Sequence, residues 1–401
     1  MMGEEKRRID DGVLIGVGAL VIVLGIIARF LMRDFISYDA KICLLPWYDR
    51  ILEGGGIASL SAQVGNYNIP YQFAIALMTY LPIKPLYAIK ALSCIFDVAL
   101  AASAVFLYRS VASRATTGRC VLVFAVLFAL PTVCLNSAAW GQCDAIYATF
   151  VFLAVAFVFR KHPYAAALML GFALAAKLQT VFVFPFFFIW WVRAEEKPNI
   201  VLLALLVLVG LYVPCIPGFL MGRSLLDPVY VYLQQTVWYP HMTMNFPNLW
   251  GLVDVDYGTF KWPAIALTAL LVLIALVMVL RLKIDVSRPR FGYLMLLWTV
   301  WAVLFSLPAL HDRYGFVLTA LVVVATFVDR RFIPFAVILE FQDLIVYQAF
   351  LGDPTGENGI TVIPIPVLSA VFILAGIVYT VMMLRDMRGA GAFDVSTGSS
   401  K

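Results

Sequence analysis

Residues 291–328 read FGYLMLLWTVWAVLFSLPALHDRYGFVLTALVVVATFV, and this stretch sets four polar or ionisable residues between two long apolar runs. The runs 291–308 and 315–328 are each long enough to enter a lipid bilayer. A histidine and two charges between membrane spans carry a substantial desolvation cost. Loops that only reverse the chain are usually built from Gly, Ser, Asn and Pro. The composition of this loop therefore indicates a site that holds an anion.

The chain as a whole has the composition of an integral membrane protein. It has 401 residues, of which 63% are hydrophobic and 13% are charged, whereas soluble domains have about 25% charged residues. The predicted fold is therefore all-α and membrane-embedded, with little room for a soluble domain. The formal net charge of +5 does not indicate a nucleic-acid partner, because the basic residues are sorted by side of the membrane.

The apolar stretches and the basic residues together predict the topology. A span needs about 20 apolar residues, and 163–192 is either one long tilted span or two short ones that meet at Lys177. Two crossings there place most of the 29 Lys and Arg residues on one side, which marks the cytoplasmic side. We therefore expect about twelve helices in the cell membrane, with both termini cytoplasmic. The candidate spans are 12–32, 86–108, 120–136, 145–159, 163–176, 178–192, 199–221, 262–280, 291–309, 315–328, 332–350 and 363–384.

The opposite, extracytoplasmic side then collects the candidate chemistry. It begins with a structured first loop, 33–85, in which 46–52 is expected to form an interfacial amphipathic helix. The small, polar tail 389–401 is expected to be disordered. The six cysteines show no metal-ligand spacing and are expected to be buried apolar residues, with a disulfide between Cys43 and Cys143 left open.

Three polar groups near the span ends are candidate functional residues, each with a structural alternative. Asp39 follows the first span and is a candidate general base, because a membrane boundary can desolvate a carboxylate and raise its basicity; otherwise it is an ordinary interfacial acid. The turn WGQCD offers Gln142 and Asp144 as hydrogen-bonding groups for a sugar and Trp140 as a stacking face, or is a plain turn with an interfacial Trp. Lys177 has no acid beside it in the sequence, which favours a functional role over snorkelling to the interface.

The cluster 311–314 is the strongest of the candidate sites. Arg313 can donate two hydrogen bonds to a phosphate, and Lys177 would add a second positive charge. The alternative is an internal pair of Arg313 with Asp312 at a span end. The loop 230–250 is rich in aromatic and amide side chains, which suit a sugar ring but also occur in interfacial belts.

Three carboxylates inside the spans favour a different class, a lipid-phosphate or solute transporter with buried ionisable groups. Asp97 is expected to pair with Lys90. Glu340 and Asp343 lie on one helix face and either form structural hydrogen bonds or bind a proton. Transporter sites lie at repeat interfaces near the midplane, and no internal repeat is visible, so the transporter is the less favoured alternative.

The set of motifs resembles the GT-C membrane glycosyltransferases, and most of all the bacterial proteins related to the second GPI mannosyltransferase. Asp39, the turn 140–144, Lys177 with Gln179, and the cluster 311–314 occur in the family's order and relative positions. The resemblance covers 39–314; later spans match only in hydrophobicity. In relatives the last motif often has Glu where this chain has Asp312. The first loop lacks the adjacent pair of acids found in some metal-using members, so no metal or other cofactor is required by the sequence and metal use is the less favoured alternative.

The resemblance implies a catalytic membrane module at 1–330, further spans at 331–388 and the tail 389–401. It implies an inverting hexosyltransferase, with mannose favoured, that uses a polyprenyl-phosphate sugar donor and a glycan, glycolipid or protein acceptor at the extracytoplasmic face. Asp39 would be the base for the acceptor hydroxyl, and Lys177 and Arg313, with His311, would hold the donor phosphate. The sugar and acceptor pocket would be formed by Trp140, Gln142, Asp144, Gln179, Tyr314 and Asp312, the last of which would also orient Arg313.

Overall fold

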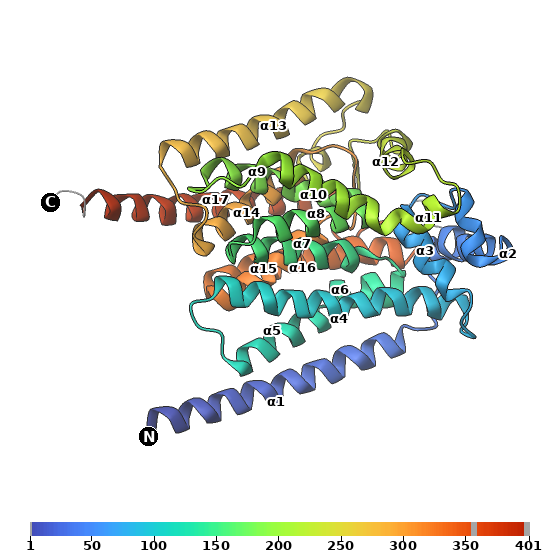
Figure 1. Ribbon diagram of the computed structural model, residues 1–401. Helices are drawn as coiled ribbons and strands as arrows, with labels where there is room; N and C mark the ends of the chain where they lie inside the picture. The colour runs from blue at the N-terminus through green and yellow to red at the C-terminus, as the bar shows by residue number, and fades with distance from the viewer. Residues whose placement is uncertain (1, 354–358, 397–401) are drawn as a thin grey trace.

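A computed structural model describes residues 2–353 and 359–396 of the chain. In this part of the chain the secondary structure is helical except for two strands of two residues each, β1 (Thr243–Met244) and β2 (Leu310–His311). The protein is thus an all-α membrane protein, as the composition predicts. Helix α1 begins and α17 ends at the same end of the bundle, at the left of Figure 1, and the first loop lies at the other end.

Seven helical segments are long and apolar enough to cross a membrane, and a bent pair adds an eighth. The bent pair is α5 (Thr117–Ala129) followed by α6 (Pro131–Cys134) and η3 (Leu135–Trp140), with an angle of 49° between the two parts. Proline at the first position of α6 accounts for the break, because it cannot donate the backbone hydrogen bond that would continue α5. The seven long segments are Asp11–Leu31 of α1 (Met2–Leu31), α4 (Pro85–Val111), Ile200–Leu220 spanning α10 (Ile200–Tyr212), η5 (Val213–Cys215) and α11 (Ile216–Leu220), α13 (Tyr257–Arg281), α14 (Pro289–Ser306), Arg330–Leu351 spanning η7 (Arg330–Phe332) and α16 (Ile333–Leu351), and Ile365–Arg388 of α17 (Ile365–Ser396).

The remaining predicted spans are short helices. α7 (Asp144–Phe159), α8 (Pro163–Ala176), η4 (Leu178–Val183) with α9 (Phe184–Arg193), and α15 (Phe316–Val328) each form an apolar helix of fewer than 18 residues. The segment 163–192 is broken at Lys177, which has an extended backbone with φ −152° and ψ 144°. Every predicted span therefore contains a helix, but twelve membrane crossings stay a prediction, because the short helices alone do not meet the length of a bilayer.

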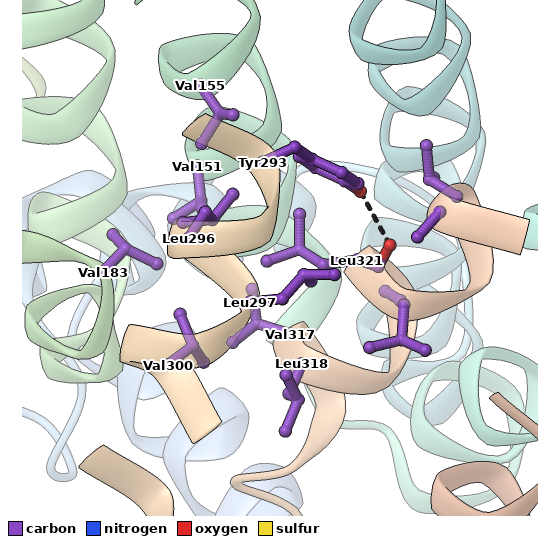
Figure 2. Packing of buried hydrophobic residues seen from close by; sticks show 14 of the residues in the cluster. Val151, Val155, Val183, Tyr293, Leu296, Leu297, Val300, Val317, Leu318 and Leu321 are labelled. Carbon is purple, nitrogen blue, oxygen red and sulfur yellow. Dashed lines mark hydrogen bonds between the residues drawn. The ribbon is translucent and has the colours of Figure 1, made fainter. Parts of the chain in front are cut away.

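The interior of the bundle is built from α7, α14 and α15. Figure 2 shows Val151 and Val155 of α7 beside Leu296 of α14, with Val317 and Leu318 of α15 to the right, next to Leu297. The hydroxyl of Tyr293 donates a 2.7 Å hydrogen bond to the carbonyl oxygen of Leu321, which satisfies its only polar group. Helices in lipid associate through close packing and such interhelical hydrogen bonds.

Close packing is most evident between α8 and α10. A Cβ atom added at Gly171 would lie 2.3 Å from the carbonyl oxygen of Val207, and one at Gly210 would lie 2.4 Å from that of Leu168. Only glycine allows this approach of the two backbones, as in other membrane helix pairs with small residues at the interface. The contact fixes α8, and therefore its end at Lys177.

The first loop folds into a small unit of its own, at the right of Figure 1. It contains η1 (Ala40–Leu44), α2 (Leu45–Glu53), η2 (Gly56–Ser61) and α3 (Ile69–Met78). α2 is amphipathic, as expected for 46–52: Tyr48 and Ile51 are buried and Leu52 is 50% exposed. The buried apolar side chains of this unit form one cluster with Ala88, Ile89 and Leu92 of α4, so the loop packs against the bundle next to Asp39.

Later connections lie at the same end. α12 (Asp227–Trp238) follows α11, and the segment after it pairs with the cluster 311–314, because β1 runs parallel to β2. η6 (Leu249–Gly251) then leads into α13. At the other end of the chain, α17 continues to Ser396, so helix extends into the segment expected to be disordered; 397–401 lie outside the described residues.

One side-chain prediction is wrong, and one alternative that was left open is excluded. Asp97 does not pair with Lys90 but with Arg29 of α1, at 2.7 Å, while the Lys90 ammonium donates to the carbonyl oxygens of Met32 and Phe35 after the end of α1. All six cysteines are free, so Cys43 and Cys143 form no disulfide.

Candidate functional site

Two π-helices position the first part of the site. η1 begins directly after Asp39, and η3 ends at Trp140, where Gly141 adopts φ +81° and lets the chain turn into α7. π-Helical turns are rare and often lie at functional sites. The hydroxyl of Ser37 donates to the carbonyl oxygen of Trp140 at 2.7 Å and so ties the two segments together.

Asp39 is held by one of its carboxylate oxygens. Oδ2 accepts hydrogen bonds from Trp140 Nε1 at 2.8 Å and from Gln142 Nε2 at 2.6 Å. Oδ1 accepts none from any described residue, and the side chain is partly exposed. The carboxylate is therefore oriented but has one oxygen free for a proton or a ligand. Trp140 supports Asp39 instead of offering an open stacking face, because it is fully buried and stacks on Phe350.

Asp144, the first residue of α7, lies between the two cations predicted for the site. Its Oδ1 is 2.5 Å from Lys177 Nζ, and its Oδ2 is 3.7 Å from Arg313 Nε. Asn136 Nδ2 also donates to Oδ2 at 2.7 Å. Lys177, which has no acid beside it in the sequence, is thus paired across the fold.

Gln142 connects the two carboxylates. Its Nε2 donates to Asp39, and its Oε1 accepts a 2.6 Å hydrogen bond from the hydroxyl of Tyr67 and lies 3.5 Å from Lys177 Nζ. The ring centroid of Tyr67 lies 5.2 Å from the same ammonium, within range for a cation–π contact. Sequence reasoning missed Tyr67, because it belongs to no motif and its neighbours in the first loop are ordinary polar residues.

Arg313 is largely buried but unsatisfied. Its guanidinium donates no hydrogen bond to any described residue, and its buried Nε meets Asp144 only as an ion pair at 3.7 Å. Nη1 is 3.9 Å from Asp312 Oδ1, which accepts instead from the backbone N–H of Arg313 at 2.8 Å. The guanidinium lies 5.6 Å from the ring centroid of Trp140. A buried guanidinium N–H that makes no hydrogen bond is energetically costly. These donors are therefore available to bind an anion.

The neighbours of Arg313 have shifted pKa values. Burial raises the pKa of Asp312 to about 7, although the positive charge of Arg313 opposes this. Burial lowers the pKa of His311 to about 3, and the charges of Arg313 and Lys177 act in the same direction. His311 is therefore neutral at pH 7 and can donate or accept a hydrogen bond without adding charge. Its ring centroid lies 4.5 Å from that of Tyr239 and 5.2 Å from that of Tyr314.

A cavity of about 230 Å³ opens beside these groups. Apolar side chains of η4 and α13 form one wall, and tyrosines and amides of the first loop and α12 form another. Tyr232, Gln235 and Tyr239 of the aromatic loop 230–250 reach it, whereas Trp250 donates to the carbonyl oxygen of Ser306 in a structural role. Of the predicted site residues, five line the cavity: Lys177, Gln179, His311, Arg313 and Tyr314.

The other five predicted site residues are outside the cavity lining. Asp39, Trp140, Gln142, Asp144 and Asp312 do not line the cavity. Four of them are joined to its lining by the contacts above: Asp144 and Gln142 through Lys177, and Asp39 and Trp140 through Gln142. Asp312 adjoins Arg313 in the chain. The structure thus gathers all ten at one end of the bundle, with cations facing the cavity and carboxylates around them.

The intramembrane carboxylates lie apart from the cavity. Glu340 accepts hydrogen bonds from the backbone N–H and the hydroxyl of Thr132. Asp343 accepts a 2.6 Å hydrogen bond from the hydroxyl of Thr319. Both are structural contacts between helices. Within 2–353 and 359–396, no three His, Cys, Asp or Glu side chains lie close enough together to hold a metal ion.

Comparison with known proteins adds no family to this geometry. No model of a known protein family matches the chain. A search of curated protein sequences finds no match either. Any function must therefore be argued from the site itself.

Proposed function

We propose that this protein is an inverting membrane glycosyltransferase that moves a hexose, with mannose favoured, from a polyprenyl-phosphate donor to an acceptor hydroxyl. One observation carries the proposal. An oriented carboxylate with a free oxygen, Asp39, is linked through Gln142 to Lys177, and Lys177 and Arg313 line one cavity. A base that is joined by hydrogen bonds to an anion site supplies the two parts that displacement of a phosphate from a sugar needs.

The chemistry assigned to each group follows from its contacts. The acceptor hydroxyl gives its proton to Oδ1 of Asp39 as its oxygen bonds to the anomeric carbon. The bond from that carbon to the phosphate oxygen breaks, and its electron pair leaves with the lipid phosphate. Lys177 and Arg313 stabilise this anion as its charge develops. His311 is neutral, so its contribution is limited to donating one hydrogen bond.

Asp144 balances one of the two positive charges of Lys177 and Arg313. A donor phosphate would take over the free hydrogen-bond donors of Arg313 and share Lys177 with Asp144. The apolar wall formed by Val181, Phe182 and Ile265 lies next to these cations, and it suits the first units of a prenyl chain. The tyrosines and amides that also line the cavity suit the sugar, whose ring has apolar faces and hydroxyl edges.

The finer topology belongs to the same proposal. Twelve spans with both termini in the cytoplasm would place the end that carries Asp39 and the first loop on the extracytoplasmic face. The positive residues near the chain ends support this orientation. A transporter is supported less, because Glu340 and Asp343 are engaged in hydrogen bonds between helices and do not line the cavity.

The test is transfer from polyprenyl-phosphate mannose by purified protein, with hydrolysis of the donor as the readout when the acceptor is unknown. Asp39→Asn should lower turnover by about 100-fold or more, as loss of a general base does, and should leave donor binding unchanged. Asp49→Asn is the matched control, since Asp49 is an exposed carboxylate of the same loop. Full turnover by Asp39→Asn would show that the base is misassigned. Donor binding without any turnover by the unaltered protein would favour transport.

A further inference from the structure

A second concave region lies at the other end of the bundle, between α16 and α17. It is a groove of about 810 Å³, with Arg331, Arg385 and Asp386 at one end. The rest of its surface is apolar. Its side chains include Leu374, Ile377 and Val378, which are 62%, 55% and 51% exposed. These residues face outward from the bundle, so the groove is open to the surrounding lipid.

The length of the groove limits what can occupy it. Between Val371 and Arg385, α17 rises about 21 Å at 1.5 Å per residue. One leaflet of a bilayer contributes about 15 Å of hydrocarbon. The groove therefore spans one leaflet and ends at the level of its head groups. A lipid chain with its head group at the arginines fits this shape, and a small soluble ligand does not.

The charges at the end of the groove select the head group. Asp386 is paired with Arg331 at 2.7 Å and with Arg290 at 3.5 Å, and Asp329 is paired with Arg331 at 2.6 Å. Arg385 has no acidic partner among the described residues. Arg330, next to Arg331 in the chain, and Arg388, three residues after Arg385, also have none in that part of the chain. The groove itself is lined by Arg331, Arg385 and Asp386, and in this region five arginines outnumber two aspartates. The surplus positive charge favours a negatively charged head group.

A second copy of the chain is a poorer occupant than a lipid. Two copies in one membrane have the same orientation, and a two-fold contact brings the same surface of each together. A contact through this groove would place both sets of arginines at the same depth, facing each other. Like charges placed opposite each other weaken an interface, whereas an anionic lipid neutralises them.

We propose that the groove between α16 and α17 is a binding site for an anionic phospholipid, with the phosphate at Arg385 and one acyl chain along Leu374, Ile377 and Val378. This site is separate from the cavity beside Lys177 and Arg313, and it does not depend on the function proposed for that cavity.

The test is lipid binding by the purified full-length protein in detergent, followed by native mass spectrometry. Phosphatidylglycerol and phosphatidylcholine with identical acyl chains are titrated separately. The unaltered protein should bind phosphatidylglycerol at least fivefold more tightly. Arg385→Gln should remove about fivefold of that preference, which corresponds to one basic residue at a membrane surface. Arg119→Gln, an exposed arginine at the start of α5 with no ion pair among the described residues, should change nothing.

A second variant tests the acyl-chain part of the groove. Val378→Trp places a large side chain in it and should weaken both lipids alike, whereas Arg385→Gln should weaken only the anionic one. Equal affinity of the unaltered protein for the two lipids would overturn the proposal. So would equal losses from Arg385→Gln and Arg119→Gln, because binding would then be a general effect of charge. Cross-linking of two copies through Val378→Cys in membranes would show that a second copy fills the groove.

Discussion

Arg29 and Arg313 are two largely buried arginines beside aspartates, and they differ in how their hydrogen bonds are used. Arg29 makes five hydrogen bonds, one for each N–H of its guanidinium, to Asp97, to Cys134 and to two backbone carbonyl oxygens. Arg313 makes none with any described residue. Arg313 lines the cavity of about 230 Å³, and Arg29 does not. A satisfied arginine holds helices together, and an unsatisfied one at a cavity is ready for a ligand.

The acids around the two arginines support the same distinction. Asp97 serves Arg29 and the hydroxyl of Ser137, so α1, α4 and η3 meet at one carboxylate. Asp144 is shared by Lys177 and Arg313, and it meets Arg313 only at 3.7 Å. The first cluster balances one positive charge with one negative charge inside the helices. The second has two cations at a cavity wall, and that surplus of donors is the reason for assigning an anion to it.

The largest expected effect is on stability, at the satisfied arginine. Arg29→Met leaves Asp97 buried without its partner, and we expect it to lower the free energy of unfolding by about 3–5 kcal/mol. Thermal unfolding in detergent measures this. Arg29→Met combined with Asp97→Leu should recover most of the loss, because no charge is then left buried. If Arg29→Met alone were as stable as the unaltered protein, Arg29 would not be a structural residue, and the contrast with Arg313 would be wrong.

Arg313→Gln should lower turnover without lowering stability. We expect turnover to fall about 100-fold or more, in line with the loss of a group that stabilises developing charge. The unfolding temperature should stay the same or rise, because no protein hydrogen bond is lost. Donor turnover and thermal unfolding are measured on the same preparation. A large loss of stability with unchanged donor affinity would make Arg313 a structural residue like Arg29.

Tyr67→Phe should have a smaller effect, confined to turnover. The change removes the hydrogen bond to Gln142, which orients Asp39, but keeps the ring next to Lys177. We expect turnover to fall about tenfold, the equivalent of about 1.4 kcal/mol, with an unchanged KM for the donor. Tyr71→Phe is the matched control, because its buried hydroxyl has no hydrogen-bond partner in the described structure. Equal effects of the two changes would remove the positioning role from Tyr67.

The smallest expected effect is a pH dependence of donor affinity. The pKa of Asp312 is raised to about 7, so the group is mostly neutral at pH 6 and mostly ionised at pH 8. The ionised carboxylate, 3.9 Å from Arg313, competes with a phosphate, and affinity should fall severalfold between these values. Asp312→Asn should abolish the change. Donor binding measured at both pH values is the test, and a slope that persists in Asp312→Asn would contradict it.

The same shift affects stability, with a defined sign. A carboxyl group whose pKa is raised on folding stabilises the fold below its ordinary pKa, and this contribution is lost as the pH rises to about 7. His311, whose pKa is lowered to about 3, has the opposite effect. It lowers the stability of the fold as the pH falls below the ordinary pKa of a histidine. The two slopes oppose each other between about pH 4 and 6.5. Asp312→Asn should therefore leave a protein whose stability rises with pH in that window.

The sequence predicted the helices well, because apolar length alone is sufficient for a membrane span. It also predicted the break at Lys177 as one of two alternatives. The sequence did not predict the partner of a charged side chain where that partner lies on another helix. Lys90 and Asp97 are about 10 Å apart along α4 at 1.5 Å per residue, and each has a nearer partner that the sequence places far away: the chain after α1 for Lys90 and Arg29 for Asp97.

The candidate site was predictable only in part, for the same reason. Residue type and a position at a span end identified Lys177 and Arg313. Their common partner Asp144 was predicted as a sugar ligand, because nothing in the sequence indicates that α7, α8 and the cluster 311–314 meet. Tyr67 reaches the site only because the first loop folds as a unit. Contacts set by packing between helices are not encoded in spacing along one helix.

The shortness of α8 has a consequence for the lipid around it. Its 14 residues rise about 21 Å, which is about 9 Å less than the hydrocarbon thickness of a bilayer. A helix too short for its membrane makes the nearby lipid thinner or draws water inward. A hydrated depression above Lys177 would let a lipid-anchored phosphate meet a water-borne acceptor while its chain stays in its own leaflet. Membrane thickness, set by lipid composition, would then tune access to the site.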